Sequence, residues 1–121
     1  MEKVEKMTQE MRAEICSKAI LYYGAKAQLV MTMEELSELQ KACSKIYRNI
    51  DLVIGESWND ADRLKKAALL ENLAEEVADV YIMINQLKKV FPVQKNITEY
   101  MDIKLARLND TLIKEGVRLH V

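Results

Sequence analysis

Apolar residues recur at spacings of three and four along most of the chain, which is the period of an amphipathic helix. The longest such run extends from Leu64 to Leu87. Pro92 stands just beyond it and would end the helix, because proline lacks the backbone N–H that the next turn requires. We therefore predict a long helix that is capped by Asp60 or Asp62 and ends near Val90.

The first half of the chain predicts two more helices. Thr8 would cap the first, which runs to about Tyr23, and Gly24 suits its C-terminal end. The second helix follows at once, over about Ala25–Arg48. The pattern then breaks over residues 49–62, where Gly, Ser, Asn and Asp gather, and this stretch is predicted to be a loop in which residues 51–54 could hold a turn of helix.

A fourth helix is predicted after Pro92. Asn96 with Glu99 three residues later resembles a capping box, and Gly116 fits the C-terminal end. The chain would therefore be all-α, a four-helix-bundle-like single domain over residues 1–121 with long antiparallel second and third helices. Its length suits one domain, and three glycines and one proline leave few places to end an element.

Two acid clusters of the same shape lie on the second and third helices. Glu35 and Glu38 are three residues apart in the first cluster, and Glu76 and Asp79 are three apart in the second, so each pair shares a helix face. If the helices pack at ~8–10 Å, the four carboxylates can converge on one cation. The alternative is a solvated acidic face, since acids are common on helix surfaces.

The types of donor restrict the metal. The single histidine, His120, lies outside any ExxH element of the kind that di-iron bundles use, and no histidine or thiolate set suits zinc. Carboxylates alone favour Mg²⁺ or Mn²⁺. Because protein-bound Mg²⁺ commonly completes its shell with water and substrate phosphates, the ligand would be a nucleotide or another phosphorylated small molecule.

The composition argues against several classes of binding partner. A net charge of −1 gives no reason to expect a nucleic-acid polymer or an anionic membrane as partner. The charged first ten residues do not resemble a signal peptide, and no apolar run reaches the ~18 residues of a membrane helix, so a cytoplasmic location is expected. Cys16 and Cys43 have no CxxC spacing and are predicted to be reduced core thiols.

The segments 34–39 (EELSEL) and 75–80 (EEVADV) resemble the paired motifs of MazG-like nucleoside triphosphate pyrophosphohydrolases, in the all-α superfamily that includes the dimeric dUTPases. The resemblance covers roughly residues 20–110. It implies a MazG-type fold, cleavage of a nucleoside triphosphate between the α and β phosphates, and a homodimer or homotetramer. It also implies that Glu35, Glu38, Glu76 and Asp79 hold Mg²⁺, and we assign Glu38 as the candidate general base.

Cationic and aromatic side chains supply candidates for substrate binding. Lys45 lies two turns after Glu38, and Lys104 with Arg107 forms a basic pair that is similar to the C-terminal helix of the family. These three would contact phosphates, whereas Trp58 could stack on a base and Gln28 could hydrogen-bond a base or sugar. Each is alternatively an ordinary surface or core residue.

Two rival functions remain open from the sequence. One is a binding module that holds a nucleotide or metal without turnover, and the other is a structural helical interaction module. A metal-induced rise in melting temperature would separate a real site from a solvated acidic face. Apolar residues near the N-terminus could supply an intersubunit face: Met7, Met11, Ile15, Ile20 and Leu21.

Overall fold

The computed structural model describes residues 4–56 and 59–117, and these residues form five helices and no strand. The chain divides into two compact units, one ending at Val90 and the other beginning at Phe91. The all-α prediction is confirmed, with one helix more than the four expected. The helices are α1 (Gln9–Tyr23), α2 (Ala25–Arg48), α3 (Ile50–Ile54), α4 (Asp60–Val90) and α5 (Gln94–Lys114).

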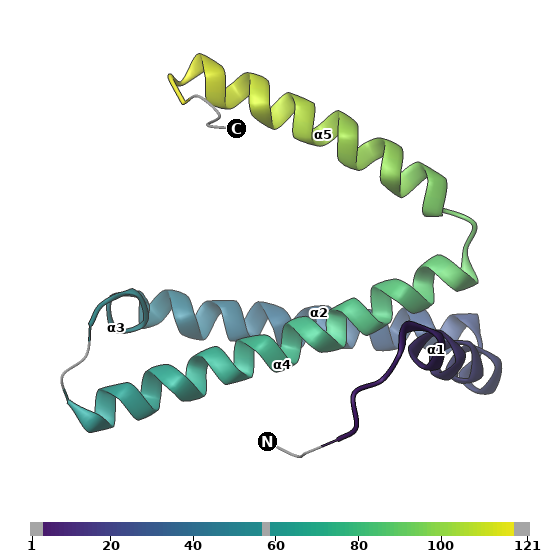
Figure 1. Ribbon diagram of the computed structural model, residues 1–121. Helices are drawn as coiled ribbons and strands as arrows, with labels where there is room; N and C mark the ends of the chain where they lie inside the picture. The colour runs from purple at the N-terminus through teal and green to yellow at the C-terminus, as the bar shows by residue number, and fades with distance from the viewer. Residues whose placement is uncertain (1–3, 57–58, 118–121) are drawn as a thin grey trace. The chain divides into compact units, whose positions relative to one another are not determined.

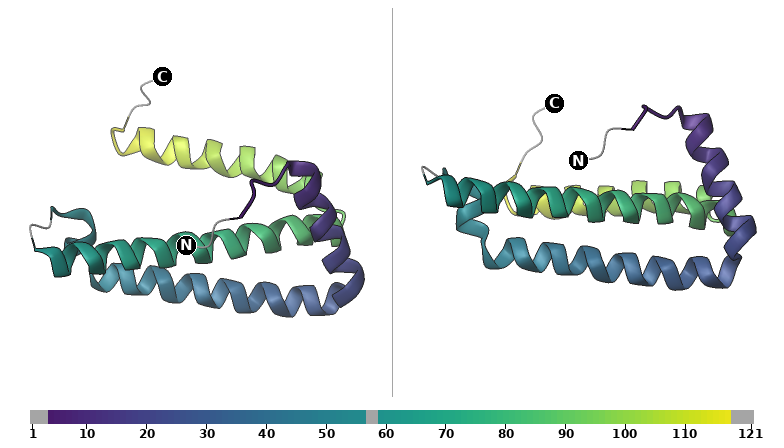
Figure 2. Two further views of the ribbon diagram at one scale, coloured as in Figure 1. Left: turned by 60° about the horizontal axis from the view of Figure 1, so that its bottom comes forward. Right: turned by 90° about the horizontal axis from the view of Figure 1, so that it is seen from below.

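The two long helices of the first unit carry the acid clusters. Helices α2 and α4 lie side by side and run in opposite directions (Figure 1), and the same pairing is visible from two further directions (Figure 2). Helix α1 packs near the N-terminal end of α2, and α3 packs at the opposite end of the pair. We call the interface between α2 and α4 the seam.

The ends of α1 are those that the sequence predicts. The Thr8 Oγ1 accepts a hydrogen bond from the backbone N–H of Met11 at 3.1 Å. Gly24 has φ +83°, a left-handed value that favours glycine, and it separates α1 from α2. These two local signals are sufficient to place the first helix and the start of the second.

The connection between α2 and α4 contains a short helix, α3, where the sequence allows a turn of helix over residues 51–54. The cap of α4 is Asn59 and neither Asp60 nor Asp62, because the Asn59 Oδ1 accepts a hydrogen bond from the N–H of Ala61 at 2.7 Å. Both aspartates lie in the first turn, where their charge is favourable near the helix N-terminus.

Helix α5 begins at Gln94, two residues before the predicted capping box, so that prediction is wrong. No side chain caps this end, and Asn96 and Glu99 lie inside the helix. The other end is as predicted. Gly116 has φ +87°, and the N–H of the following Val117 bonds back to the Leu112 carbonyl at 2.8 Å, which is the Schellman arrangement.

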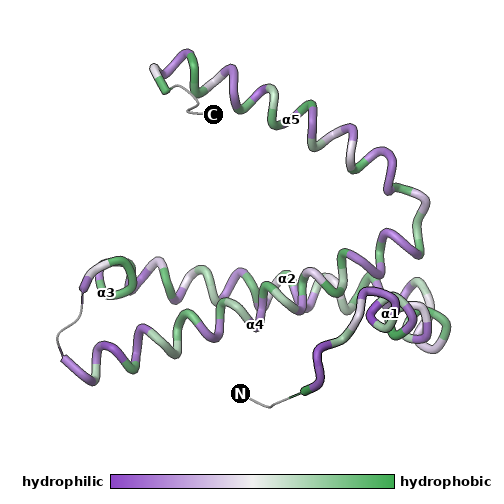
Figure 3. The backbone as a smooth tube through the Cα atoms, in the orientation of Figure 1, coloured by the Kyte–Doolittle hydropathy of each residue, from purple (hydrophilic) through white to green (hydrophobic). Residues whose placement is uncertain are grey.

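The hydrophobic core is small. Only five apolar residues among those described are buried, and three polar residues are buried beside them. Figure 3 shows hydrophobic positions recurring along α2, α4 and α5 without gathering in one segment. The buried apolar residues are Cys16, Ala42, Val53, Val80 and Met83, and the buried polar residues are Gln28, Thr32 and Gln86.

The cysteines are both free, as expected, but only Cys16 is buried. Cys43 is exposed, so the prediction that it is a core thiol is wrong for the single chain. Within the described residues, no helix is long and apolar enough to cross a membrane.

Candidate metal centre

Three carboxylates meet at the seam. Glu35 comes from α2, and Glu76 and Asp79 come from successive turns of α4. One oxygen from each lies within 4.8 Å of the other two, and all three residues are half-buried. The spacing of three residues in α4 is what allows one helix to supply two ligands to the same point.

The three acids perturb one another. Partial burial, followed by the charges of Asp79 and Glu76, raises the pKa of Glu35 above its ordinary value of 4.5. A hydrogen bond with Asp79 acts in the same direction. Burial, followed by the charges of Asp79 and Glu38, likewise raises the pKa of Glu76. The cluster therefore resists carrying its full negative charge unless a cation is bound.

The donor set fits a small hard cation. Mg²⁺ binds oxygen ligands at about 2.0–2.1 Å, so two ligands on opposite sides of the ion would be separated by roughly 4.2 Å. The three oxygens lie within 4.8 Å of one another, and rotation of the side chains can bring them to coordination distance. Three carboxylates leave several coordination positions for water or substrate oxygens.

Glu38 lies outside this group of three. Its Oε1 accepts from Lys41 Nζ at 3.4 Å, in an exposed ion pair one turn along α2. Its charge still contributes to the raised pKa of both Glu35 and Glu76, so it is in electrostatic contact with the cluster. This position at the edge of the cluster suits an outer ligand or a base that acts on a bound water.

Lys45 is the predicted phosphate ligand that the structure brings near the acids. Its positive charge acts on Glu76 and opposes the rise of the Glu76 pKa. It is exposed, so its ammonium group is available to an anionic ligand. Lys104 and Arg107 lie one turn apart on α5, which belongs to the second unit. Trp58 lies outside the described residues.

Gln28 is on the seam and is fully buried. Neither its Oε1 nor its Nε2 has a protein hydrogen-bond partner, whereas its backbone carbonyl accepts from Thr32 Oγ1 at 2.7 Å. An exposed contact to a base or sugar, as the sequence suggested, would require this side chain to become accessible.

Gln86 was not identified from the sequence. It is 5% exposed, and its Oε1 also lacks a protein partner. Gln28 precedes Glu35 by seven residues and Gln86 follows Asp79 by seven, so the antiparallel register places the two glutamines at one level of the seam, two turns from the acids. Applying that register to the sequence would have revealed the pair.

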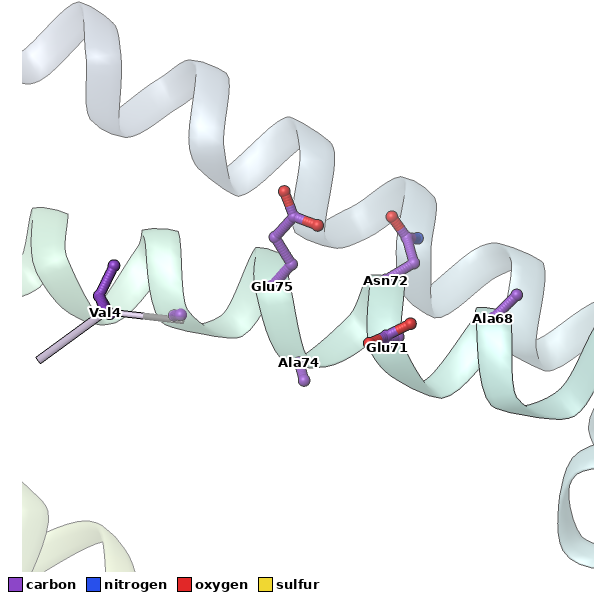
Figure 4. Close-up of a pocket in the computed structure, with 7 residues that line it drawn as sticks. Val4, Ala68, Glu71, Asn72, Ala74 and Glu75 are labelled. Atoms are coloured by element: carbon purple, nitrogen blue, oxygen red, sulfur yellow. The ribbon is translucent and has the colours of Figure 1, made fainter. Parts of the chain in front are cut away.

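A hollow of about 860 Å³ lies beside α4 in the first unit. Figure 4 shows its lining, to which α4 contributes every residue except Val4 of the segment before α1. Two of the lining side chains, Glu71 and Glu75, are carboxylates, and the other lining residues carry no charge. The hollow lacks the cationic groups that a polyphosphate needs, so the seam remains the candidate site.

Comparison with protein-family models, with curated proteins and with solved structures finds no match to this chain. The acids at the seam and their surroundings are therefore the features that bear on its function.

Proposed function

We propose that this protein is a magnesium-dependent nucleoside triphosphate pyrophosphohydrolase with a MazG-type fold. One observation carries the proposal: Glu35, Glu76 and Asp79, from two antiparallel helices, present oxygens within 4.8 Å of one another. These are three of the four acids that the paired motifs select. The raised pKa values of Glu35 and Glu76 add support, because clustered carboxylates with perturbed pKa values are typical of functional sites.

Each residue of the candidate site then has a role in the reaction. Glu35, Glu76 and Asp79 would hold Mg²⁺, or Mn²⁺ in its place, and Glu38 would join them or act on water at the edge of the cluster. Bound metal would neutralise phosphate charge and lower the pKa of a coordinated water. Lys45, whose positive charge acts on Glu76, would contact phosphate oxygens.

The reaction consumes one water for each triphosphate. The water oxygen forms a bond to phosphorus while the bond to the oxygen that bridges the α and β phosphates breaks. The water proton passes to a carboxylate, for which Glu38 is the candidate, and nucleoside monophosphate and pyrophosphate leave. Lys104 and Arg107 are proposed to bind the triphosphate through their positive charges.

The test is pyrophosphate release from a panel of ribo- and deoxynucleoside triphosphates, with Mg²⁺ and with EDTA. Glu35→Gln should abolish release. Glu75→Gln is the matched control, because Glu75 is an exposed glutamate next to the cluster but outside the group of three. Release that persists in EDTA or in Glu35→Gln would refute the proposal. A metal-induced thermal shift without release from any triphosphate would favour a binding module.

Glu38→Gln separates the two roles of Glu38. If Glu38 is a base, the variant should keep the Mg²⁺-induced rise in melting temperature but lose turnover by about 10²–10⁴-fold. If Glu38 is a metal ligand, both the thermal shift and the turnover should fall. Unchanged turnover would remove Glu38 from the mechanism.

A further inference from the structure

Two buried glutamines lie near one end of the seam. Gln28 is the fourth residue of α2, and Gln86 lies four residues before Val90, where α4 ends. Gln28 is fully buried and Gln86 is 5% exposed, and the Gln28 Oε1, Gln28 Nε2 and Gln86 Oε1 atoms have no hydrogen-bond partner among the described residues. Native structures leave few buried polar groups unpaired, so two such amides at one level of the seam indicate a site whose hydrogen bonds a bound group completes.

The described surroundings of the two amides do not supply these bonds. Thr32 carries the buried hydroxyl one turn after Gln28, and this hydroxyl donates to the Gln28 backbone carbonyl at 2.7 Å instead of to the amide. The buried residues of α4 within two turns of Gln86, Val80 and Met83, are apolar. The two amides are therefore a polar layer set beside apolar packing.

The amides and the nearest predicted phosphate ligand lie on opposite sides of the acids along α2. Gln28 precedes Glu35 by seven residues, a distance of about 10 Å along the helix. Lys45 follows Glu38 by seven residues in the other direction, and its positive charge acts on Glu76. A nucleotide whose phosphates are held at the acids and by Lys45 would therefore extend its sugar and base toward the amides.

We propose that Gln28 and Gln86 bind the base of the nucleotide and select an amino group beside a ring nitrogen acceptor on its pairing edge, as in cytosine and adenine, over a carbonyl, as in uracil. This inference rests on the proposed function, because it takes the acids to hold the metal that binds the phosphates. It adds the class of base, which the acids do not determine, and it gives Gln86 a role in specificity.

The unpaired atoms of the two amides define the selection. They are two carbonyl oxygens, which accept hydrogen bonds, and one amide nitrogen, which donates them. The amino group of cytosine or adenine has two N–H groups, one for each glutamine oxygen, and the adjacent ring nitrogen accepts from Gln28 Nε2. Gln28 alone also pairs with uracil, because its amide can turn over. A uracil carbonyl would then face the Gln86 oxygen with no proton between the two oxygens.

The end of the seam gives access to the amides. The backbone N–H of Gln28 donates to the Gly24 carbonyl at 3.1 Å, so Gln28 lies one turn from the corner between α1 and α2. Rotation about its side-chain torsions brings the amide out at this end, and such changes on binding are common. Tyr22 and Tyr23, the two residues before Gly24, are exposed with ring centroids 4.8 Å apart, and they offer aromatic surface on which a base can stack.

The first test measures the binding of cytidine monophosphate and uridine monophosphate in Mg²⁺ by isothermal titration calorimetry. The two ligands differ only in an amino group or a carbonyl at one ring position, so they isolate the proposed contact. Cytidine monophosphate should bind at least about 10-fold more tightly, the effect of one buried hydrogen bond that uracil cannot make. Adenosine and inosine monophosphate differ by the same exchange and should follow the same order, as should kcat/KM for the corresponding triphosphates.

Two substitutions separate the contributions of the amides. Gln86→Met should bring the affinities for cytidine and uridine monophosphate close to each other, because Gln28 pairs with either base. Gln28→Met should weaken the binding of both by about 10-fold. Gln40→Met is the control, because Gln40 is exposed on the same helix and its replacement should leave both affinities unchanged. Circular dichroism shows whether each variant keeps its helices.

Equal binding of the two members of each pair, a preference for the carbonyl bases, or no binding of any monophosphate would overturn the proposal. So would a preference that persists in helical Gln28→Met and Gln86→Met. Pyrophosphate release without a preference among bases would support the proposed reaction and remove only the role of the glutamines. A preference in binding without pyrophosphate release would support the role of the glutamines and remove the reaction.

Discussion

Replacing the buried Gln28 by methionine should stabilise the protein. Gln28 is fully buried, and neither polar atom of its amide has a protein partner. Methionine has a similar length and is unbranched, so it fills the same space without an amide. Both side chains lose similar conformational freedom on burial, so this contribution largely cancels in the comparison.

The expected size of the effect follows from the unpaired amide. Burying a polar group without a hydrogen bond costs about 1–3 kcal/mol. Removing that penalty should raise the free energy of unfolding by about 2 kcal/mol. For a chain of this length, such a change corresponds to a rise in melting temperature of roughly 8 °C.

The assay is urea and thermal unfolding of wild type, Gln28→Met and the control Gln40→Met. Gln40 lies on the same helix but is exposed, so the same substitution there should change stability by less than about 0.5 kcal/mol. Protein concentration has to be held constant, because any self-association would also change the melting temperature.

A loss of more than about 1 kcal/mol in Gln28→Met would refute this reasoning. It would mean that the amide is hydrogen-bonded in solution, either to Gln86 at the same level of the seam or to a buried water. The double variant with Gln86→Met distinguishes these cases. If the two amides pair with each other, the second substitution should recover part of the loss caused by the first.

Three other predictions concern the acids and the turn between α1 and α2. Without metal, Glu35→Gln should raise the melting temperature by relieving repulsion, and it should also abolish the Mg²⁺-induced rise, as calorimetry would show. In EDTA, the raised pKa values of Glu35 and Glu76 mean that the folded state holds protons that the unfolded state has released. The free energy of unfolding should therefore fall as pH rises from about 4.5 through the raised pKa values. A free energy of unfolding that does not change with pH over this range would contradict this. Gly24→Ala should lower the free energy of unfolding by about 1–2 kcal/mol in urea titrations, because alanine is strained at φ +83°.

Short-range signals predicted the helices well. The bounds of α2 and the end of α4 before Pro92 depend on periodicity and on residues that cannot continue a helix. The prediction failed where several candidates for one role stood close together. Asn59, Asp60 and Asp62 can each cap a helix, and the sequence does not show which of them has the extended backbone that a cap requires.

The candidate site, like the helices, could be predicted from the periodicity of apolar residues. Glu35, Glu76 and Asp79 converge because each acid borders an apolar stripe that has to face the other helix. The exposure of residues on the flanks of the helices was harder to predict, because it depends on what packs against them and helical periodicity does not show this. The spacing of Cys43 is that of a core residue, yet Cys43 is exposed in the single chain. Helical periodicity places Lys104 and Arg107 on one face of α5 but contains no information on tertiary contacts.

The acids and the two glutamines of the seam affect the alignment of α2 with α4 as well as the chemistry of the site. Antiparallel helices with uniformly apolar stripes can slip by a heptad with little loss of packing. Here a seven-residue slip that brought Gln28 to the level of Asp79 would move Glu35 to the level of Asn72 and separate the three acids. The alignment that brings the acids together also brings Gln28 to the level of Gln86, so bound metal would favour this register over the slipped one. The buried apolar residues of α4, Val80 and Met83, lie between the acids and Gln86, so polar and apolar residues alternate along the seam and together define the alignment of the two helices.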